Sequence, residues 1–260
     1  MIAATQALGA QNTRQPMQRQ RGAFNLQPLR AFKAVRRLIA DKEDTAQVFE
    51  IMRALSGKAI PWGYRRLMST AEGGRIAYER DEFADRLSDP AWLAQFGPGT
   101  VGAAYRDFIA PRGLSAEGLA NESRKIPEAD IDAAHPLAWY ARRMRDVHDV
   151  WHVLTGYGTD ALGEVCVVAF SYEQTRSLGF AVIALAGARQ FQKAGTGQPY
   201  DRAVSEARRN GKAAAWLPAV DYPALFALPL EEARRQLKIA PNTAYQAIPP
   251  EYRDRFHHAA

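Results

Sequence analysis

The sequence predicts an all-α fold, in which a single bundle-like helical domain over residues 26–260 follows a flexible basic segment over residues 1–25. Apolar residues recur at helical spacing along most of the chain, whereas the apolar–polar alternation that is typical of strands is scarce. Turn and cap signals separate these segments, such as Asp89-Pro90 before a helix and Gly156 after one. A chain of 260 residues is long enough to bury a substantial core in one domain.

The N-terminal segment, residues 1–25, is predicted to be disordered. It is rich in glutamine and arginine, contains no acid and lacks apolar periodicity. An arginine-rich start without acids also occurs in mitochondrial transit peptides, but glutamine rather than serine predominates here, which disfavours that interpretation. The single cysteine, Cys166, excludes an internal disulfide and fits a reducing compartment. No apolar run reaches the roughly 18 residues of a membrane span.

Residues 26–41 are predicted to form a basic amphipathic helix. Its apolar residues recur at helical spacing (Leu29, Phe32, Val35 and Ile39), and its basic residues fall on other faces. The favoured interpretation is a first helix that packs on the core and keeps a solvated basic face. The alternative is contact with an anionic membrane surface. No nucleic-acid partner is expected, because the chain has a net charge of +6 but no recognition motif.

The remaining helices are predicted from the same periodicity and from their caps. In chain order they cover residues 41–55, the region 73–89, a segment that starts at Pro90, 101–110 with Thr100 as its cap, 136–155, 161–191 with Asp160 as its cap and a kink near Gly179, 203–212, and 230–239. Residues 111–129 and 193–201 are expected to be loops, because proline and glycine are frequent there and periodicity is absent.

Two of the five histidines, His148 and His152, lie four residues apart on the predicted helix 136–155. Side chains at this spacing share one face of a helix. The helix ends at glycines, and Glu164 falls near the first turn of the next helix, so a helical hairpin can return its carboxylate to the two imidazoles. A histidine pair alone is more often structural. Two imidazoles with a carboxylate, however, form a three-ligand set for a divalent metal, with open positions for water or substrate.

Two neighbours of the histidine pair are candidate catalytic residues. Asp149 can be a fourth metal ligand, a partner that orients an imidazole N–H, or a group that transfers a proton. Arg145, three residues before His148, could hold an anionic substrate, or it could pair with Asp149 or Glu164. Because aspartate stands where the H-E-x-x-H motif of metalloproteases has glutamate, peptidase activity is not expected.

The pattern H-D-x-x-H, then eleven residues, then glutamate resembles the signature of the Coq-four family of ubiquinone biosynthesis proteins. His148, Asp149, His152 and Glu164 fill it. Further blocks are similar to that family: RDVHDVWHVLTG (145–156), ALGEVCVVAF (161–170), FGPGTVGAAYRDFI (96–109), ARRNGKAAAW (207–216) and LEEARRQLKI (230–239). The resemblance covers most of the chain from about residue 30. One departure is Arg-Ser-Leu at 176–178, where the family usually has Gly-Leu-Pro.

The resemblance implies a helical protein with a divalent metal at this set, zinc first, with manganese, iron and cobalt left open. It implies a decarboxylase, a lyase that acts at ring carbon one of a polyprenylated 4-hydroxybenzoate-type precursor, with hydroxylation proposed to accompany the loss of the carboxylate. The implied partners are this substrate, other ubiquinone biosynthesis proteins and a membrane surface, with a homodimer left open. A peripheral site on the cytoplasmic face of a bacterial inner membrane is favoured over the matrix side of the mitochondrial one.

The alternative function is a non-enzymatic scaffold that binds the lipid tail and organises the biosynthetic enzymes, with a structural metal. An open coordination position would favour the enzyme, and a closed four-ligand set would favour the scaffold. Apolar residues of the predicted helix 161–191 could line a groove for the tail; they are Val165, Val168, Phe170, Leu178, Phe180, Val182, Ile183 and Leu185. For most of them plain core packing is the favoured interpretation.

Overall fold

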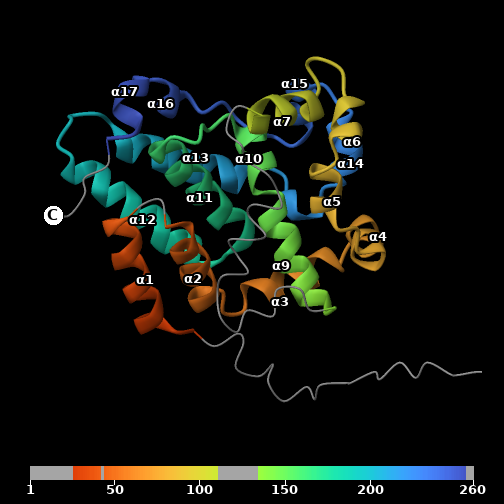
Figure 1. Ribbon diagram of the computed structural model, residues 1–260, viewed down its shortest axis with the longest axis horizontal. Helices are drawn as coiled ribbons and strands as arrows, with labels where there is room; N and C mark the ends of the chain where they lie inside the picture. Colours follow the sequence, from red (N-terminus) through yellow and green to blue (C-terminus); the bar gives the residue numbers. More distant parts are fainter. Residues whose placement is uncertain (1–25, 42–43, 111–133, 256–260) are drawn as a thin grey trace, which may run out of the picture.

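The structure is a computed structural model that describes residues 26–41, 44–110 and 134–255. Every regular element in these ranges is a helix (Figure 1), which confirms the all-α prediction. The elements are α1 (Pro28–Ala40), α2 (Thr45–Leu55), α3 (Ala59–Leu67), α4 (Ala71–Glu79), α5 (Phe83–Leu87), α6 (Pro90–Ala94), α7 (Val101–Ile109), α9 (Pro136–Asp146), α10 (His148–Thr155), α11 (Ala161–Thr175), α12 (Leu178–Lys193), α13 (Tyr200–Ala213), the 3₁₀ turn η3 (Leu217–Ala219), α14 (Tyr222–Phe226), α15 (Leu230–Gln236), α16 (Thr243–Gln246) and α17 (Pro250–Arg253).

Three segments for which the sequence makes a prediction lie outside the residues that the structure describes. The segment 1–25 and the loop 111–129 lie outside the described residues, as does the end of the predicted domain at 256–260. The domain boundary at residue 26 therefore stays a prediction. Among the residues that the structure describes, no helix is both long and apolar enough to cross a membrane.

Helix α11 lies in the middle of the molecule, between α10, α12 and α13 (Figure 1). It is apolar around most of its circumference, as expected for a helix that is covered on all sides. Glycine allows the close contact with α13: a Cβ at Gly211 of α13 would lie 2.5 Å from the carbonyl oxygen of Phe170. Val165, Val168 and Phe170 are buried here, so core packing is the correct interpretation for these three candidate groove residues.

An aromatic cluster holds α7 against the rest of the core. The ring of Phe226 in α14 lies 5.5 Å from that of Phe83, 5.1 Å from Trp92, 5.6 Å from Phe96 and 5.5 Å from Tyr105. Aromatic rings at these separations attract each other beyond the burial of their area. Because Tyr105 belongs to α7, the cluster fixes the helix that packs beside α10.

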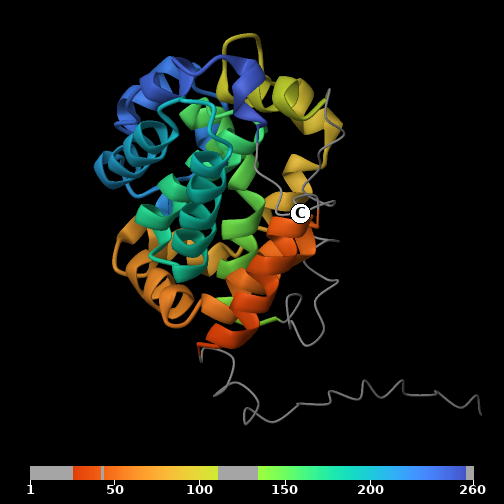
Figure 2. The same cartoon turned by 90° about the vertical axis from the view of Figure 1, so that its left-hand side faces the viewer.

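Helix α1 packs on α2 and α12 through only part of the predicted apolar stripe, since Val35 packs against the cluster that these helices share. Its buried residues are Ala31 and Ala34, whereas Leu29 is 79% exposed and Phe32 is 62% exposed. Small alanines allow close approach of two helices, so they face the neighbours together with Val35 and Leu38, whereas Leu29 and Phe32 point outward. In Figures 1 and 2 α1 lies on the outside of the helical body.

Three predicted helices are divided in the structure. The region 73–89 forms α4 and α5, because Arg80 ends α4 in the left-handed conformation with φ of 49°. Residues 136–155 are divided at Val147 (φ −86°, ψ 1°) into α9 and α10. Residues 161–191 are divided not at Gly179 but at Arg176, which adopts the left-handed conformation with φ of 58°. Gly179 instead allows close packing, since a Cβ there would lie 2.7 Å from the sulfur of Met52. The short helices α3, α14, α16 and α17 were not predicted, because so few turns carry little periodicity.

The contact at Gly211 generates a test of this packing. Gly211→Ala places a methyl group against backbone of α11, and we expect the free energy of unfolding to fall by roughly 1–3 kcal/mol. Gly74→Ala is the matched control, because a Cβ there meets no atom within 4 Å, and it should stabilise α4 by about 0.5–1 kcal/mol. Urea denaturation of both variants checks the pair. Equal effects would show that α11 and α13 do not pack this closely.

Candidate metal centre

His148, His152 and Glu164 converge at the junction of α10 and α11. The Nε2 atoms of the two histidines are 3.2 Å apart, and Oε2 of Glu164 lies 3.6 Å from His148 Nε2 and 3.4 Å from His152 Nε2. A tetrahedral ion with bonds of about 2.1 Å holds its ligand atoms about 3.4 Å apart. The three measured distances therefore fit one divalent ion. The predicted helical hairpin brings three of the four predicted ligands together.

The ring of His152 is held by a hydrogen bond and by stacking on an aromatic ring. The side chain is 1% exposed, and its Nδ1 lies 3.1 Å from the carbonyl oxygen of Tyr157. Since a carbonyl can only accept, Nδ1 carries the proton and Nε2 is left with its lone pair toward the other ligands. Phe108 of α7 stacks on the ring, with centroids 5.5 Å apart and planes 25° apart. His152 is thus fixed in both tautomer and orientation.

The other two ligands are more accessible. The His148 side chain is 24% exposed and that of Glu164 is 45% exposed. Desolvation opposes ionisation of Glu164, but the imidazoles of His152 and His148 hold the pKa of its carboxyl well below the usual range. Burial likewise acts against protonation of His152, yet the Glu164 carboxylate raises the pKa of that imidazole. The cluster is closed on the His152 side and open toward solvent on the Glu164 side.

A tight turn between the two helices makes this convergence possible. Gly156 ends α10 with φ of 73°, and its N–H donates to the His152 carbonyl at 2.8 Å. Asp160 caps α11 by accepting from the Gly163 N–H at 2.8 Å, as predicted. A Cβ at Gly163 would lie 2.1 Å from the Gly158 carbonyl oxygen, so only glycine allows α11 to start this close to the turn.

Arg234 of α15 caps the other end of the turn. Its Nε donates to the Leu154 carbonyl at 2.8 Å and its Nη2 donates to the Val153 carbonyl at 3.0 Å. These carbonyls belong to the last turn of α10, where intrahelical partners run out. Sequence reasoning missed Arg234, because nothing in local spacing connects residues 80 positions apart.

The two predicted catalytic residues lie beside the cluster but not in it. Asp149 is 5% exposed and is outside the group of ligand atoms that converges within 4.8 Å, so this arrangement does not make it a fourth ligand. Burial raises the pKa of the Asp149 carboxyl, while His148 and His152 act in the opposite direction. Arg145 donates from Nε to the Oδ1 of Asp146 at 2.7 Å, a partner that differs from both acids expected for it.

Comparison with known proteins supports the resemblance found in the sequence. Residues 26–243 match the family model described as "Coenzyme Q (ubiquinone) biosynthesis protein Coq4". The mitochondrial ubiquinone biosynthesis protein COQ4 homologue of Rattus norvegicus is 29% identical over 170 residues, which is 65% of this chain and 62% of that protein. The homologue of Xenopus laevis is 33% identical over 104 residues, 40% of this chain and 34% of that protein. The matched region is therefore less than two thirds of the relatives' own length.

A solved structure shows the same fold. The crystal structure of a Nostoc punctiforme protein named for ubiquinone biosynthesis superposes with a TM-score of 0.61 at 20% identity, and the match covers 83% of this chain and 99% of that one. At this identity the likeness establishes the helical architecture alone. Because the family model covers most of the chain, from the start of α1 to the start of α16, this protein belongs to the Coq4 family of coenzyme Q (ubiquinone) biosynthesis proteins.

Proposed function

We propose that the protein acts in ubiquinone biosynthesis as a metal-dependent decarboxylase that removes the carboxylate at ring carbon one of a polyprenylated 4-hydroxybenzoate-type precursor. The convergence of His148, His152 and Glu164 in a member of this family carries the proposal. Among the residues that the structure describes, three side chains converge as ligands, and a set of three leaves coordination positions for water or substrate, as in catalytic rather than closed structural sites. Zinc is the first candidate for the ion, and manganese, iron and cobalt are alternatives.

The bond that breaks joins the ring carbon to the carboxyl carbon, and its electron pair stays on the ring as carbon dioxide leaves. A divalent ion in this site would supply a Lewis acid that polarises a substrate oxygen and so stabilises that charge. A proton must then be added to the ring carbon. Asp149 is the proposed donor, because its carboxyl is buried one residue beyond His148. A coupled hydroxylation would instead require dioxygen and a redox-active ion: one oxygen atom would replace the carboxylate and the other would leave in hydrogen peroxide formed with water, so the mass of the product distinguishes the two outcomes.

Arg145 is proposed to hold an anionic group of the substrate beside the cluster. Its side chain is 10% exposed and its guanidinium is bonded to Asp146, which is almost completely buried. Burial raises the pKa of Asp146 to about 6, and the guanidinium of Arg145 acts against this shift. A guanidinium has five N–H donors in a planar fork, a geometry that matches the two oxygens of a carboxylate.

The exposed face of α1 is proposed to rest on a membrane surface, where a polyprenylated substrate would reside. Leu29 and Phe32 are largely exposed, and the basic residues Lys33, Arg36 and Arg37 are exposed on the same helix. Apolar side chains flanked by cations match an interface of anionic headgroups over acyl chains. The exposed Leu178 and Leu185 of α12, the neighbouring helix, add apolar surface.

Loss of one ligand tests the central proposal. Wild-type protein should carry about one divalent ion per chain and release carbon dioxide from a prenylated 4-hydroxybenzoate. His152→Ala should lose both while keeping its helical circular dichroism. His135→Ala is the matched control, because His135 caps α9 through the Leu137 N–H and is outside the cluster. No ion in wild type under any loading condition would refute the metal site; an ion without carbon dioxide release would leave the scaffold function.

The proton-donor role of Asp149 has a separate test. Asp149→Asn keeps the size of the side chain but removes the acid, so release of carbon dioxide should fall by roughly 10²–10⁴-fold while metal content is retained. Asp107→Asn serves as the control, because the Asp107 side chain on α7 is 77% exposed. An unchanged rate in Asp149→Asn would remove this residue from the mechanism.

Vesicle binding tests the membrane face. The double variant Leu29→Glu, Phe32→Glu should bind vesicles of mixed zwitterionic and anionic phospholipid at least about tenfold more weakly, because each apolar side chain contributes on the order of 1.5–3 kcal/mol when buried. Tyr78→Glu on α4 is the matched control, since Tyr78 is 89% exposed. Co-sedimentation measures both, and equal binding of the two variants would place the membrane contact elsewhere.

A further inference from the structure

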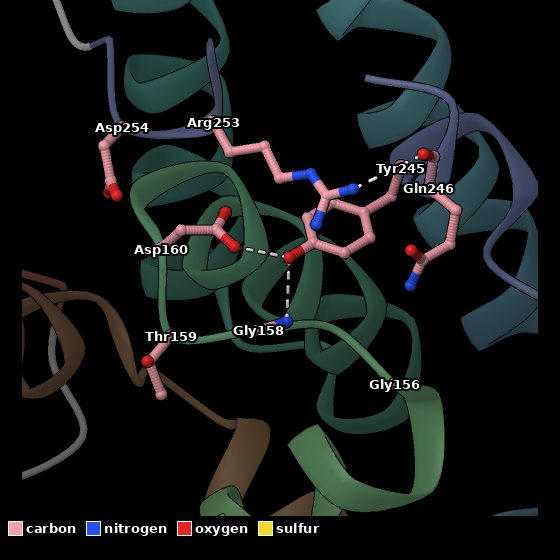
Figure 3. Close-up of a pocket in the computed structure, with 8 residues that line it drawn as sticks. All are labelled: Gly156, Gly158, Thr159, Asp160, Tyr245, Gln246, Arg253 and Asp254. Atoms are coloured by element: carbon pink, nitrogen blue, oxygen red, sulfur yellow. Dashed lines mark hydrogen bonds between the residues drawn. The ribbon is translucent and has the colours of Figure 1, made fainter. Parts of the chain in front are cut away.

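The peptide group that joins Tyr157 to Gly158 is hydrogen-bonded through both its carbonyl and its N–H. Its carbonyl oxygen lies 3.1 Å from His152 Nδ1, and its N–H donates to the Tyr245 hydroxyl oxygen at 3.0 Å. That hydroxyl donates in turn to Oδ2 of Asp160 at 2.5 Å. Figure 3 shows the last two bonds, with Tyr245 placed between the turn and the start of α11. A continuous chain of hydrogen bonds therefore runs from a metal-ligand candidate to a carboxylate.

Each group in this chain has only one possible role. The carbonyl accepts and the amide donates, so the Tyr245 hydroxyl accepts a hydrogen bond from the amide. Its own O–H must then donate a hydrogen bond to the Asp160 carboxylate. Burial and the Asp160 carboxylate raise the pKa of Tyr245, which keeps the hydroxyl protonated. Hydrogen bonds in series polarise one another. The negative charge of Asp160 thus strengthens the Tyr157 carbonyl as an acceptor for the His152 N–H.

We propose that Tyr245 and Asp160 are positioning residues of the metal centre, which act through the Tyr157–Gly158 peptide to orient the His152 ring and to make its Nε2 a stronger ligand. In many metal sites a carboxylate bonds directly to the second nitrogen of the ligating histidine. Here the Tyr157–Gly158 peptide group and Tyr245 lie between the Asp160 carboxylate and His152 Nδ1. The proposal rests on the proposed metal-dependent function.

The surroundings hold Tyr245 in a single position. Its side chain is 1% exposed, the guanidinium of Arg253 lies 4.3 Å from the centre of its ring, and the Tyr157 ring packs edge-on at 5.3 Å. A Cβ at Gly158 would lie 2.8 Å from the Tyr245 hydroxyl oxygen and 2.7 Å from Asp160 Oδ2. Any side chain at position 158 would push the hydroxyl away from the amide, so this position requires glycine.

A hollow of about 450 Å³ lies on the outer side of this arrangement, lined in part by Asp160, Tyr245 and Arg253 (Figure 3). His148, His152 and Glu164 are not among its lining residues. We therefore assign this hollow to the back of the metal centre, behind the turn, and not to the substrate.

Alternatively, Tyr245 could serve only to hold the C-terminal helices on the core. In that case its loss would affect metal affinity no more than the loss of another buried tyrosine hydroxyl. Tyr222 provides the matched comparison. Its buried hydroxyl also makes two hydrogen bonds, accepting from Trp151 Nε1 at 2.7 Å and donating to the Leu217 carbonyl at 3.0 Å. It reaches the same helix, α10, but has no bond to the Tyr157–Gly158 peptide. Loss of either hydroxyl should lower the free energy of unfolding, whereas only loss of the Tyr245 hydroxyl should weaken His152 as a metal ligand.

The test is the affinity of the full chain for Zn²⁺, measured by competition with a chelator, together with urea unfolding of the metal-free protein. Tyr245→Phe should bind Zn²⁺ about 10–100-fold more weakly, while Tyr222→Phe stays within about twofold of wild type. Asp160→Asn can still cap Gly163 but lacks the charge, so it should also bind more weakly, and it should add little in the Tyr245→Phe background.

The outcomes distinguish failure of the proposed metal-dependent function from failure of the positioning role. If wild type does not bind Zn²⁺ or any other divalent ion, the proposed function falls and the positioning role falls with it. If wild type binds and Tyr245→Phe binds equally well, the positioning role alone is overturned. Equal losses of affinity in Tyr245→Phe and Tyr222→Phe would overturn it too, because affinity would then follow general stability. If Tyr245→Phe fails to fold, Asp160→Asn provides the test instead, and an unchanged Zn²⁺ affinity in that variant overturns the positioning role.

Discussion

The contact between Gly163 and the Gly158 carbonyl oxygen determines how closely α11 can return to α10. A methyl group in place of the glycine hydrogen would stand 2.1 Å from that oxygen, so a larger residue would force the two helices apart. Glu164 is the next residue, and its carboxylate reaches the two histidines only because the approach is so close. The burial of α11 among its neighbours and the aromatic cluster behind α7 then keep both helices in place.

The centre combines one rigid ligand with more adaptable ones. His152 has a fixed tautomer, a fixed ring plane and almost no exposure, whereas the Glu164 side chain is about half exposed. Preorganised ligands reduce the reorganisation that accompanies binding, and an accessible carboxylate allows water or substrate to share the ion. This asymmetry supports the proposed catalytic function, in which one side of the ion would exchange ligands.

The sequence was informative where the chemistry is local. The spacing of His148 and His152, the glycine-bounded turn and the Asp160 cap all lie within 17 residues, and each has a short-range signal. Long-range partners leave no such signal: Arg234 and Tyr245 come from helices 80 and 87 residues away from their partners in the turn. The stripe of α1 was assigned only in part, because the buried face is centred on the small residues Ala31 and Ala34, which leaves Leu29 and Phe32 exposed while Val35 still packs inward.

The chain of bonds through Tyr245 has a consequence for the order in which the site is completed. The three ligand candidates are close in sequence, so their hairpin needs only a short loop to close, and short loops close at low entropic cost. Tyr245, which accepts a hydrogen bond from the Tyr157–Gly158 peptide, is made only when a later part of the chain emerges from the ribosome. A nascent chain therefore presents its three ligand candidates before the hydrogen bond to Tyr245 can form.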